Sequence, residues 1–230
     1  MLAIAFVIFV IALTVACAYY VRVTGRIEGP FAAYVLLTTA SQIMASKIAT
    51  FDFIVASVTA PAGAITIAAT VLMTDLVNER FGRAEVHRMI LVTLVTQIAL
   101  AIFLYVGGAL PAAPFWQNQN SWDSLLGLVP RITLASWVTF LVAENLDAWL
   151  YSKIRAVTGE KHLWARNSIS SLLSLTVDTI VFVTLAFAGT GLPLLSLMIG
   201  QWVAKYIFTI LAIPGMYLSR AVMNPAAKKG

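Results

Sequence analysis

The sequence predicts an all-α fold, a polytopic transmembrane helical bundle that forms one transporter-sized domain over residues 1–230. Of its residues 60% are hydrophobic and only 11% are charged, whereas a soluble domain is about 25% charged. Long apolar runs recur from end to end, each near the roughly 20 residues that a helix needs to cross the bilayer core. The short alternating segments typical of a membrane β-barrel are missing from this pattern.

Seven apolar segments account for the crossings. A Gly-Pro pair at 29–30 and the glycines and prolines between 107 and 114 separate neighbouring segments. The motif APAG at 60–63 predicts a kink or a re-entrant break inside the third segment. The predicted helices cover about 2–21, 31–50, 54–77, 87–108, 131–152, 168–189 and 193–218.

The basic residues predict the orientation, because Lys and Arg concentrate in cytoplasmic loops. Twelve of the fifteen Lys and Arg residues lie in the first, third and fifth loops and in the C-terminal tail. This alternation requires an odd number of crossings, so we predict seven helices with the N-terminus outside and the C-terminus inside. A six-helix bundle, in which one apolar run does not cross, is the alternative.

Charged side chains lie within or beside several apolar runs. Such groups are costly in the bilayer, so they face the bundle interior or a wet cavity, and they are functional-site candidates. Lys205 lies near the centre of the last segment, and Arg131 begins the fifth. The acidic members of this group are Asp52, Asp75, Glu79, Glu144, Asp147 and Asp178. A purely structural ion pair is the alternative for the buried members, and Arg131 could instead reach the outer headgroups.

Spacing of three or four residues places many of these polar side chains on single helix faces. Four predicted helices therefore present narrow polar edges, which should converge on a polar pocket between helices. The edges are Asp75 with Glu79, Glu144 with Asp147, Gln201 with Lys205, and a stripe of Asn167, Ser170, Ser171, Ser174 and Asp178.

The sequence lacks the motifs of common enzymes. It has no Gly-rich phosphate loop and no nucleophile elbow, and its two histidines, His87 and His162, fall in loops. We therefore expect no enzyme activity, no metal and no cofactor. The single Cys17 excludes a disulfide framework. The net charge of +5 is concentrated in particular loops, so nucleic acid is not an expected partner.

Five segments carry a family resemblance. They are SQIMASK (41–47), PAGAITIAATVLMTDLVNERFG (61–82), PRITLASWVTFLVAENLDAWLYSKI (130–154), LWARNSISSLLSLTVDTIVF (163–182) and GQWVAKYIFTILAIPGMYL (200–218). In this order they resemble the queuosine precursor transporter family of vitamin-uptake-like membrane transporters. The resemblance implies uptake of a 7-deazaguanine base, such as preQ0 or preQ1, across the cytoplasmic (inner) membrane. Members of this family resemble the substrate-binding subunits of energy-coupling-factor importers. The resemblance implies, however, that they transport their substrate without a dedicated ATPase.

The resemblance also implies site residues. Family motifs match Lys47, Asp75, Glu79, Gly82, Asp147, Arg166, Asn167, Asp178, Thr179, Gln201 and Lys205. The predicted substrate-binding residues are Lys47, Asp75, Glu144, Asp147, Asn167, Asp178, Thr179, Gln201 and Lys205, and Glu79, Arg131 and Arg166 are predicted to gate or support the site. Gln42 and Glu144 stand where the family pattern has Asn and Gln.

Chemistry assigns roles to some of these residues. A carboxylate can accept two hydrogen bonds from the ring N–H and the exocyclic amine of a deazaguanine. We predict that Asp178 or Glu144 does so, with Asn167 and Lys205 assisting. Asp75 and Lys47 would form a pairing partner or a gate.

The energy source and the partners stay open at this stage. A membrane carboxylate could couple proton entry to uptake, and facilitated diffusion with trapping inside the cell is the alternative. A homo-oligomer and an energising module are further partners to consider. Two other functions are alternatives: a substrate-binding subunit of an energy-coupling-factor importer for a related heterocycle, and a seven-helix retinal protein that uses Lys205.

Overall fold

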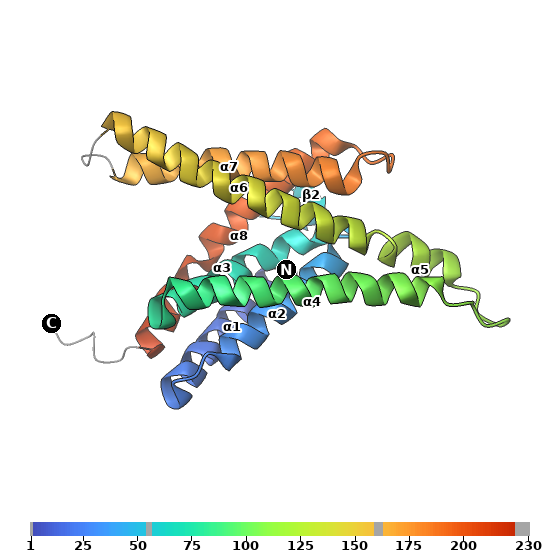
Figure 1. The fold of residues 1–230 in the computed structure, drawn as a ribbon, viewed down its shortest axis with the longest axis horizontal. Coiled ribbons are helices and arrows are strands. Elements are labelled where there is room, and N and C mark those ends of the chain that lie inside the picture. Colours follow the sequence, from blue (N-terminus) through green and yellow to red (C-terminus); the bar gives the residue numbers. More distant parts are fainter. Residues whose placement is uncertain (1, 54–56, 159–162, 224–230) are drawn as a thin grey trace.

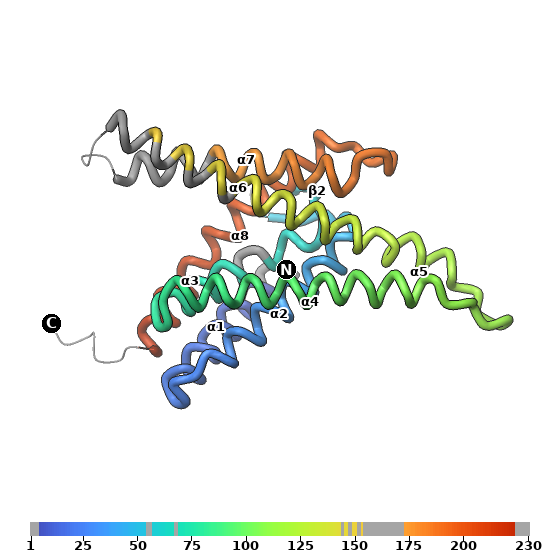
Figure 2. The backbone as a smooth tube through the Cα atoms, viewed as in Figure 1, coloured from blue at the N-terminus to red at the C-terminus, as the bar shows by residue number. Residues whose placement is uncertain are grey.

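The fold comes from a computed structural model, which describes residues 2–53, 57–158 and 163–223 (Figure 1). Figure 2 draws the backbone as a tube in the same view. Its α-helices are α1 (Leu2–Thr24), α2 (Glu28–Met44), α3 (Ile67–Phe81), α4 (Arg83–Ala109), α5 (Gln119–Leu126), α6 (Val129–Thr158), α7 (Leu163–Phe187) and α8 (Leu194–Met223). Strands β1 (Ile48–Asp52) and β2 (Ser57–Pro61) precede a 3₁₀ turn, η1 (Ala62–Thr66). The described part of the chain is therefore mostly helical, as predicted.

Helix α8 is the central element of the bundle. It crosses diagonally between the paired helices α6 and α7 and the group formed by α1 to α4 (Figure 1). It packs on α1, α3, α7 and β2. Its Phe208 is fully buried. The Phe208 ring meets the rings of Phe51 in β1 and of Phe53 just after β1 edge-on, at centroid distances of 5.4 and 5.5 Å. These contacts hold the N-terminal and C-terminal halves of the chain together.

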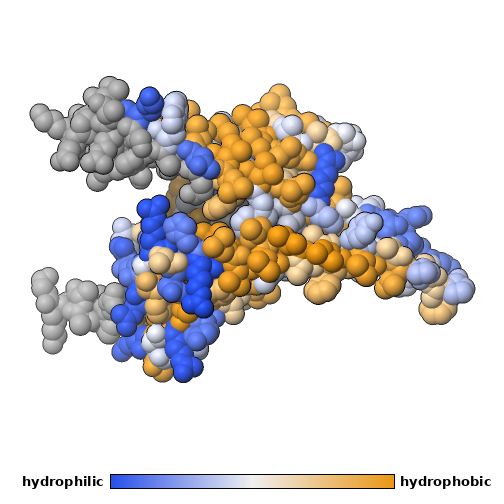
Figure 3. Space-filling model, in the orientation of Figure 1, coloured by the Kyte–Doolittle hydropathy of each residue, from blue (hydrophilic) through white to orange (hydrophobic). Residues whose placement is uncertain are grey.

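The surface is divided as expected for a protein surrounded by a bilayer. The α1–α2 turn, the α3–α4 turn and the end of α8 lie together at one end, at the left of Figure 1, and α5 lies at the other. Figure 3 shows a broad apolar band between hydrophilic side chains at these two ends. The first of these ends carries the basic residues of the first and third loops.

Four helical segments of the described chain are long and apolar enough to cross a membrane. They are Ala5–Thr24, Arg83–Ala109, Gln119–Ala143 and Leu194–Met223, and Leu173–Phe187 is a shorter apolar helix. Helices α2 and α3 have only 17 and 15 residues. They fall below the length of a full crossing because the chain between them is not helical.

The predicted helices over 31–50 and 54–77 are wrong in that intervening region. Residues 48–52 and 57–61 instead form an antiparallel pair of strands, with Ile48 opposite Pro61 and Asp52 opposite Ser57. Hydropathy cannot separate a short buried strand from a buried helix, and these runs are rich in β-branched and aromatic residues that favour strands. The predicted break at 60–63 is confirmed, because β2 ends and η1 begins there.

Close backbone approach at two glycines encloses this hairpin. A β-carbon at Gly200 of α8 would collide with the backbone carbonyl group of Thr59. A β-carbon at Gly63 would lie 2.5 Å from the backbone carbonyl oxygen of Ser41. Small residues allow such contacts between membrane segments. Non-helical backbone is tolerated at membrane depth only where protein or water surrounds it, so these contacts are what permits a hairpin here.

Replacing Gly200 with alanine should lower the thermal stability of the protein. The added methyl group overlaps Thr59, and overpacking of this kind costs about 1–3 kcal/mol. Gly108→Ala is the matched control, because a β-carbon there meets nothing closer than Trp122 at 3.6 Å. Thermal unfolding in detergent measures both variants. Equal melting temperatures for Gly200→Ala and the wild type would contradict this account of hairpin packing.

Candidate functional site

A cavity of about 250 Å³ lies where α2, α3, α6, α7 and α8 meet the hairpin region, which consists of β1, β2 and η1. Its lining combines an ion pair, two carboxamides, several hydroxyl groups and two phenyl rings. The residues are Ser41, Gln42, Ala45, Pro61, Gly63, Ala64, Thr70, Ser136, Thr139, Phe140, Asp178, Phe182, Gln201 and Lys205. A few placed polar groups among apolar walls are typical of a site for a small molecule.

The ion pair joins α7 to α8. The Lys205 ammonium donates to Oδ2 of Asp178, and the two side chains are 7% and 22% exposed. Both charges lie on helices that an apolar environment surrounds, so pairing offsets part of their desolvation cost. An ionised carboxylate has about four lone-pair positions. Asp178 can therefore hold Lys205 and still accept hydrogen bonds from a molecule in the cavity.

Two buried oxygens of the cavity lining have no hydrogen-bond partner among the described residues. They are Oε1 of Gln201 and Oγ1 of Thr139. Gln201 is 4% exposed and Thr139 is 1% exposed. Buried polar atoms are nearly always paired, and leaving one unpaired costs about 1–3 kcal/mol. A ligand or water that reaches these atoms would supply a donor to the Gln201 oxygen and a donor or an acceptor to the Thr139 hydroxyl. The two atoms therefore mark where a polar ligand could bind.

One wall of the cavity is a hydrogen-bonded network of uncharged groups. Nε2 of Gln42 donates to Oε1 of Gln97 at 3.1 Å, and Nε1 of Trp137 donates to the same oxygen at 3.0 Å. The Ser136 hydroxyl donates to Oε1 of Gln42 at 3.3 Å. Gln42 and Gln97 are both buried. The network ties α2, α4 and α6 together beside the cavity.

Three of the predicted substrate residues share this cavity: Asp178, Gln201 and Lys205. Thr179 is buried next to Asp178, but its hydroxyl donates to the Leu175 carbonyl within α7 at 2.9 Å. Lys47 is exposed in the turn after α2, where its carbonyl accepts the Ala62 N–H at 2.8 Å. The structure thus places Lys47 and Thr179 at the edge of the site rather than in its lining.

Asp75 and Glu79 lie elsewhere, toward the end of α3. The Arg220 guanidinium donates to the Glu79 carboxylate and also interacts electrostatically with Asp75. This cluster joins α3 to the last turn of α8, at the end of the bundle that carries the basic loops. Such a position suits a gate or a structural clamp better than a substrate contact.

Arg131 binds the C-terminal end of α7. Its Nε donates to the Leu185 carbonyl at 2.8 Å and one terminal nitrogen donates to the Ala188 carbonyl at 2.6 Å. The last carbonyls of a helix lack intrahelical donors and carry the negative end of its dipole. Arg131 therefore joins α6 to α7 as a helix cap, a support for the site.

The remaining predicted residues lie outside the described side chains. Glu144 and Asp147 belong to α6, and Arg166 and Asn167 belong to α7, but the structure describes only their backbone. Their roles stay predictions.

Sequence reasoning missed the uncharged part of the lining. Ser136 and Thr139 recur three residues apart on α6, and Gln97 is a lone amide in the apolar run of α4. The spacing on α6 and the buried amide were usable signals. They were weaker than charge, because hydroxyl residues also serve as small packing residues in membrane helices.

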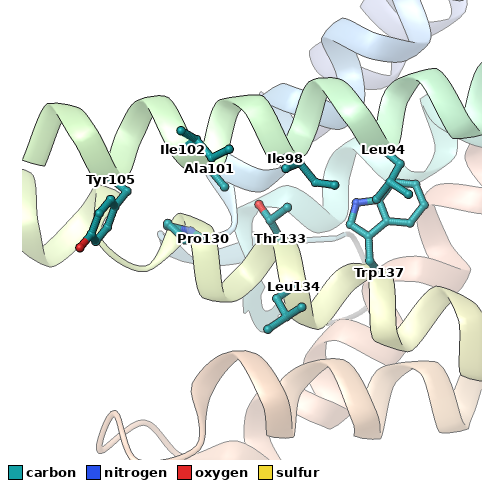
Figure 4. A pocket seen from close by; sticks show the side chains of 9 residues that line it. All are labelled: Leu94, Ile98, Ala101, Ile102, Tyr105, Pro130, Thr133, Leu134 and Trp137. Carbon is teal, nitrogen blue, oxygen red and sulfur yellow. The ribbon is translucent and has the colours of Figure 1, made fainter.

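A second, larger hollow lies between α4 and α6 and has a volume of about 390 Å³ (Figure 4). Side chains of α4 face those of α6 across it: Leu94, Ile98, Ala101, Ile102 and Tyr105 against Pro130, Thr133, Leu134 and Trp137. No charged residue lines it. It belongs to two helices that qualify as membrane spans, so lipid tails suit it better than a polar substrate does.

Comparison with known proteins now identifies the family. Residues 61–219 match the family described as "Putative vitamin uptake transporter". The chain belongs to the vitamin uptake transporter family. With its several apolar helices it is a multi-pass membrane protein of a transporter family. The matched range includes Asp178 and Lys205, which favours a transporter over a retinal protein as the explanation of that lysine.

Two relatives carry the name "Probable queuosine precursor transporter". The Bacillus subtilis protein is 26% identical over 168 residues, which are 72% of this chain and 73% of the relative. The Haemophilus influenzae protein is 26% identical over 134 residues, 58% of this chain and 54% of the relative. No solved structure matches this chain.

Lys205→Met should destabilise the protein more when Asp178 is present than when it is neutralised. Removing one partner of a buried pair costs about 3–5 kcal/mol, because the other charge stays unpaired. We expect the lower end of that range, since Asp178 is open to the cavity. Melting temperatures of Lys205→Met, Asp178→Asn and the double variant form the test. Losses that simply add in the double variant would show that the two side chains do not interact.

Proposed function

We propose that this chain imports a queuosine precursor, a 7-deazaguanine base, across the cytoplasmic membrane and holds it in the 250 Å³ cavity beside Asp178 and Lys205. The observation that carries the proposal is a charged pair and an unpartnered buried amide oxygen in one cavity of a vitamin-uptake family member. The names of the two relatives supply the substrate class.

The lining offers complementary groups for such a base. In our proposal Asp178 accepts from the ring N–H and the exocyclic amine, a charge-assisted bidentate contact. Gln201 Oε1, which is buried, accepts a further ligand N–H. Phe140 and Phe182 provide apolar cover for the ring faces. A base that lacks the donor pair would leave the carboxylate unpaired, and sites of this kind reject such analogues strongly.

Asp178→Asn should weaken binding of 7-deazaguanines at least tenfold. A neutral amide replaces the charge-assisted contact, and hydrogen bonds to charged groups contribute about 1.5–3 kcal/mol. Asp123→Asn is the matched control, because Asp123 lies on α5 and its carboxylate contacts Gln119. Calorimetric titration of the purified protein with preQ0, preQ1 and guanine gives the affinities. Unchanged affinity in Asp178→Asn would remove Asp178 from the site.

We further propose that the transport is coupled to protons through Asp75, which lies with Glu79 and Arg220 toward the end of α3. Asp178 is unsuited to this role, because it has to stay ionised to accept the substrate N–H groups. A proton on Asp75 would remove its attraction to Arg220 and weaken the contact between α3 and α8. In liposomes that contain only this chain, uptake of labelled substrate should be faster when the outside is more acidic. Asp75→Asn should abolish this dependence. An identical rate with and without the gradient would leave facilitated diffusion, and no uptake without added ATPase would favour the importer-subunit alternative.

The orientation completes the proposal: seven crossings, with the basic end of the bundle in the cytoplasm and the N-terminus outside. On this arrangement the hairpin region together with α3 forms one crossing. Cys17 is the single cysteine and is buried, so it gives little labelling background. The new cysteine of Asn118→Cys should react with a membrane-impermeant maleimide on intact cells, and that of Arg26→Cys should react only after lysis. The opposite pattern would invert the topology.

A further inference from the structure

The amide network at the cavity wall suggests how the site distinguishes ligands. Gln42 lines the cavity, and its carboxamide is also hydrogen-bonded to two side chains of other helices, Gln97 and Ser136. A carboxamide has a donor end and an acceptor end of almost equal shape. Which end faces a ligand decides whether the ligand must accept or donate a hydrogen bond. The hydrogen-bonding partners of Gln42 fix the positions of its nitrogen and its oxygen.

Trp137 fixes the donor-to-acceptor direction of each hydrogen bond in this network. An indole N–H can only donate, so the Gln97 atom that lies 3.0 Å from Trp137 Nε1 has to be the oxygen. That same oxygen lies 3.1 Å from Gln42, so the facing atom of Gln42 has to be its nitrogen. The Oε1 of Gln42 then points to the Ser136 hydroxyl, which can donate to it at 3.3 Å.

Reversal of the Gln42 amide would be unfavourable. Its oxygen would then face the Gln97 oxygen, two acceptors without a hydrogen between them, in a place where both residues are buried: Gln42 is 7% and Gln97 is 3% exposed. A buried polar group without a hydrogen-bond partner destabilises the fold by the full cost of removing that group from water. Trp137 is additionally braced by Phe140, whose ring lies 5.8 Å away edge-on and itself lines the cavity.

We infer that Gln42 determines specificity by donating its second Nε2–H to a carbonyl oxygen of the substrate, and that Gln97 and Trp137 are positioning residues that fix the orientation of the Gln42 amide. The inference rests on the proposed function. It assigns the 6-oxo group of a 7-deazaguanine to Gln42, while Asp178 holds the neighbouring N–H groups. A 6-amino base would present a donor to a donor and be rejected.

The test compares two ligands in several variants. Affinities of 7-deazaguanine and of 2,6-diamino-7-deazapurine, measured by calorimetry, give a 6-oxo over 6-amino preference for each protein. The diamino compound also lacks the ring N–H that Asp178 accepts, but this effect is common to all variants. A change in the preference between variants therefore reports on the contact at position 6 alone.

Trp137→Phe should lower the 6-oxo preference about tenfold or more, because Gln97 and then Gln42 become free to reverse and accept from a 6-amino group. Gln42→Met should lower it similarly and should also weaken 7-deazaguanine binding. Trp122→Phe on α5, away from the cavity, is the matched control and should keep the wild-type preference. Melting temperatures show whether each variant remains folded, and a preference ratio is not altered by a uniform loss of folded protein.

The outcomes separate the two proposals. If the wild type binds 7-deazaguanine and prefers the 6-oxo ligand, but Gln42→Met and Trp137→Phe keep that preference, the role of Gln42 is wrong and the proposed function stands. If the wild type binds neither ligand, both proposals fail. A loss of preference in Gln42→Met alone would retain Gln42 as the reader and overturn the positioning role of Trp137.

Discussion

The ion pair between Lys205 and Asp178 is the interaction on which the rest of the site depends. A lysine in the middle of an apolar helix requires a partner, because an isolated charge in the bilayer is costly. The partner lies on α7, so the pair brings α7 against α8. Since α7 also packs along α6, the pair fixes the position of the α6 residues that complete the cavity.

A second constraint comes from backbone rather than side chains. The hairpin of β1 and β2 interrupts what would otherwise be two long helices, and its polar backbone groups cannot face lipid. Strand pairing satisfies part of them, and α8 covers the hairpin at Gly200. The interruption is also what makes room for a cavity, because Pro61, Gly63 and Ala64 line it without bulky side chains. The packing that encloses the irregular backbone therefore also forms the cavity.

Helix α6 separates two environments of different polarity. Ser136 and Thr139 face the polar cavity, while Leu134 and Trp137 face the apolar hollow toward α4. Successive residues of a helix are rotated by about 100°, so this division follows directly from the order of residues on α6. Trp137 is suited to the boundary, because its ring contacts apolar side chains while its N–H bonds to Gln97. This hydrogen bond links the wall of the apolar hollow to the amide network beside the polar cavity.

By itself the sequence determined the membrane bundle, the transporter-like family, the break at 60–63 and the candidates Asp178, Gln201 and Lys205. Each of these depends on a local quantity: the hydropathy of a run, the position of a charge, or a spacing along one helix. Only the tertiary structure decided that residues 48–52 and 57–61 form strands, and that Gln42 lines the cavity. It also decided that Arg220 binds Glu79 and that Arg131 binds the end of α7. Those partners lie 55 residues apart for Gln42 and Gln97 and 141 residues apart for Glu79 and Arg220. No pattern within a single segment can encode such contacts, because uncharged amides and strand-forming runs acquire their meaning only from what packs beside them.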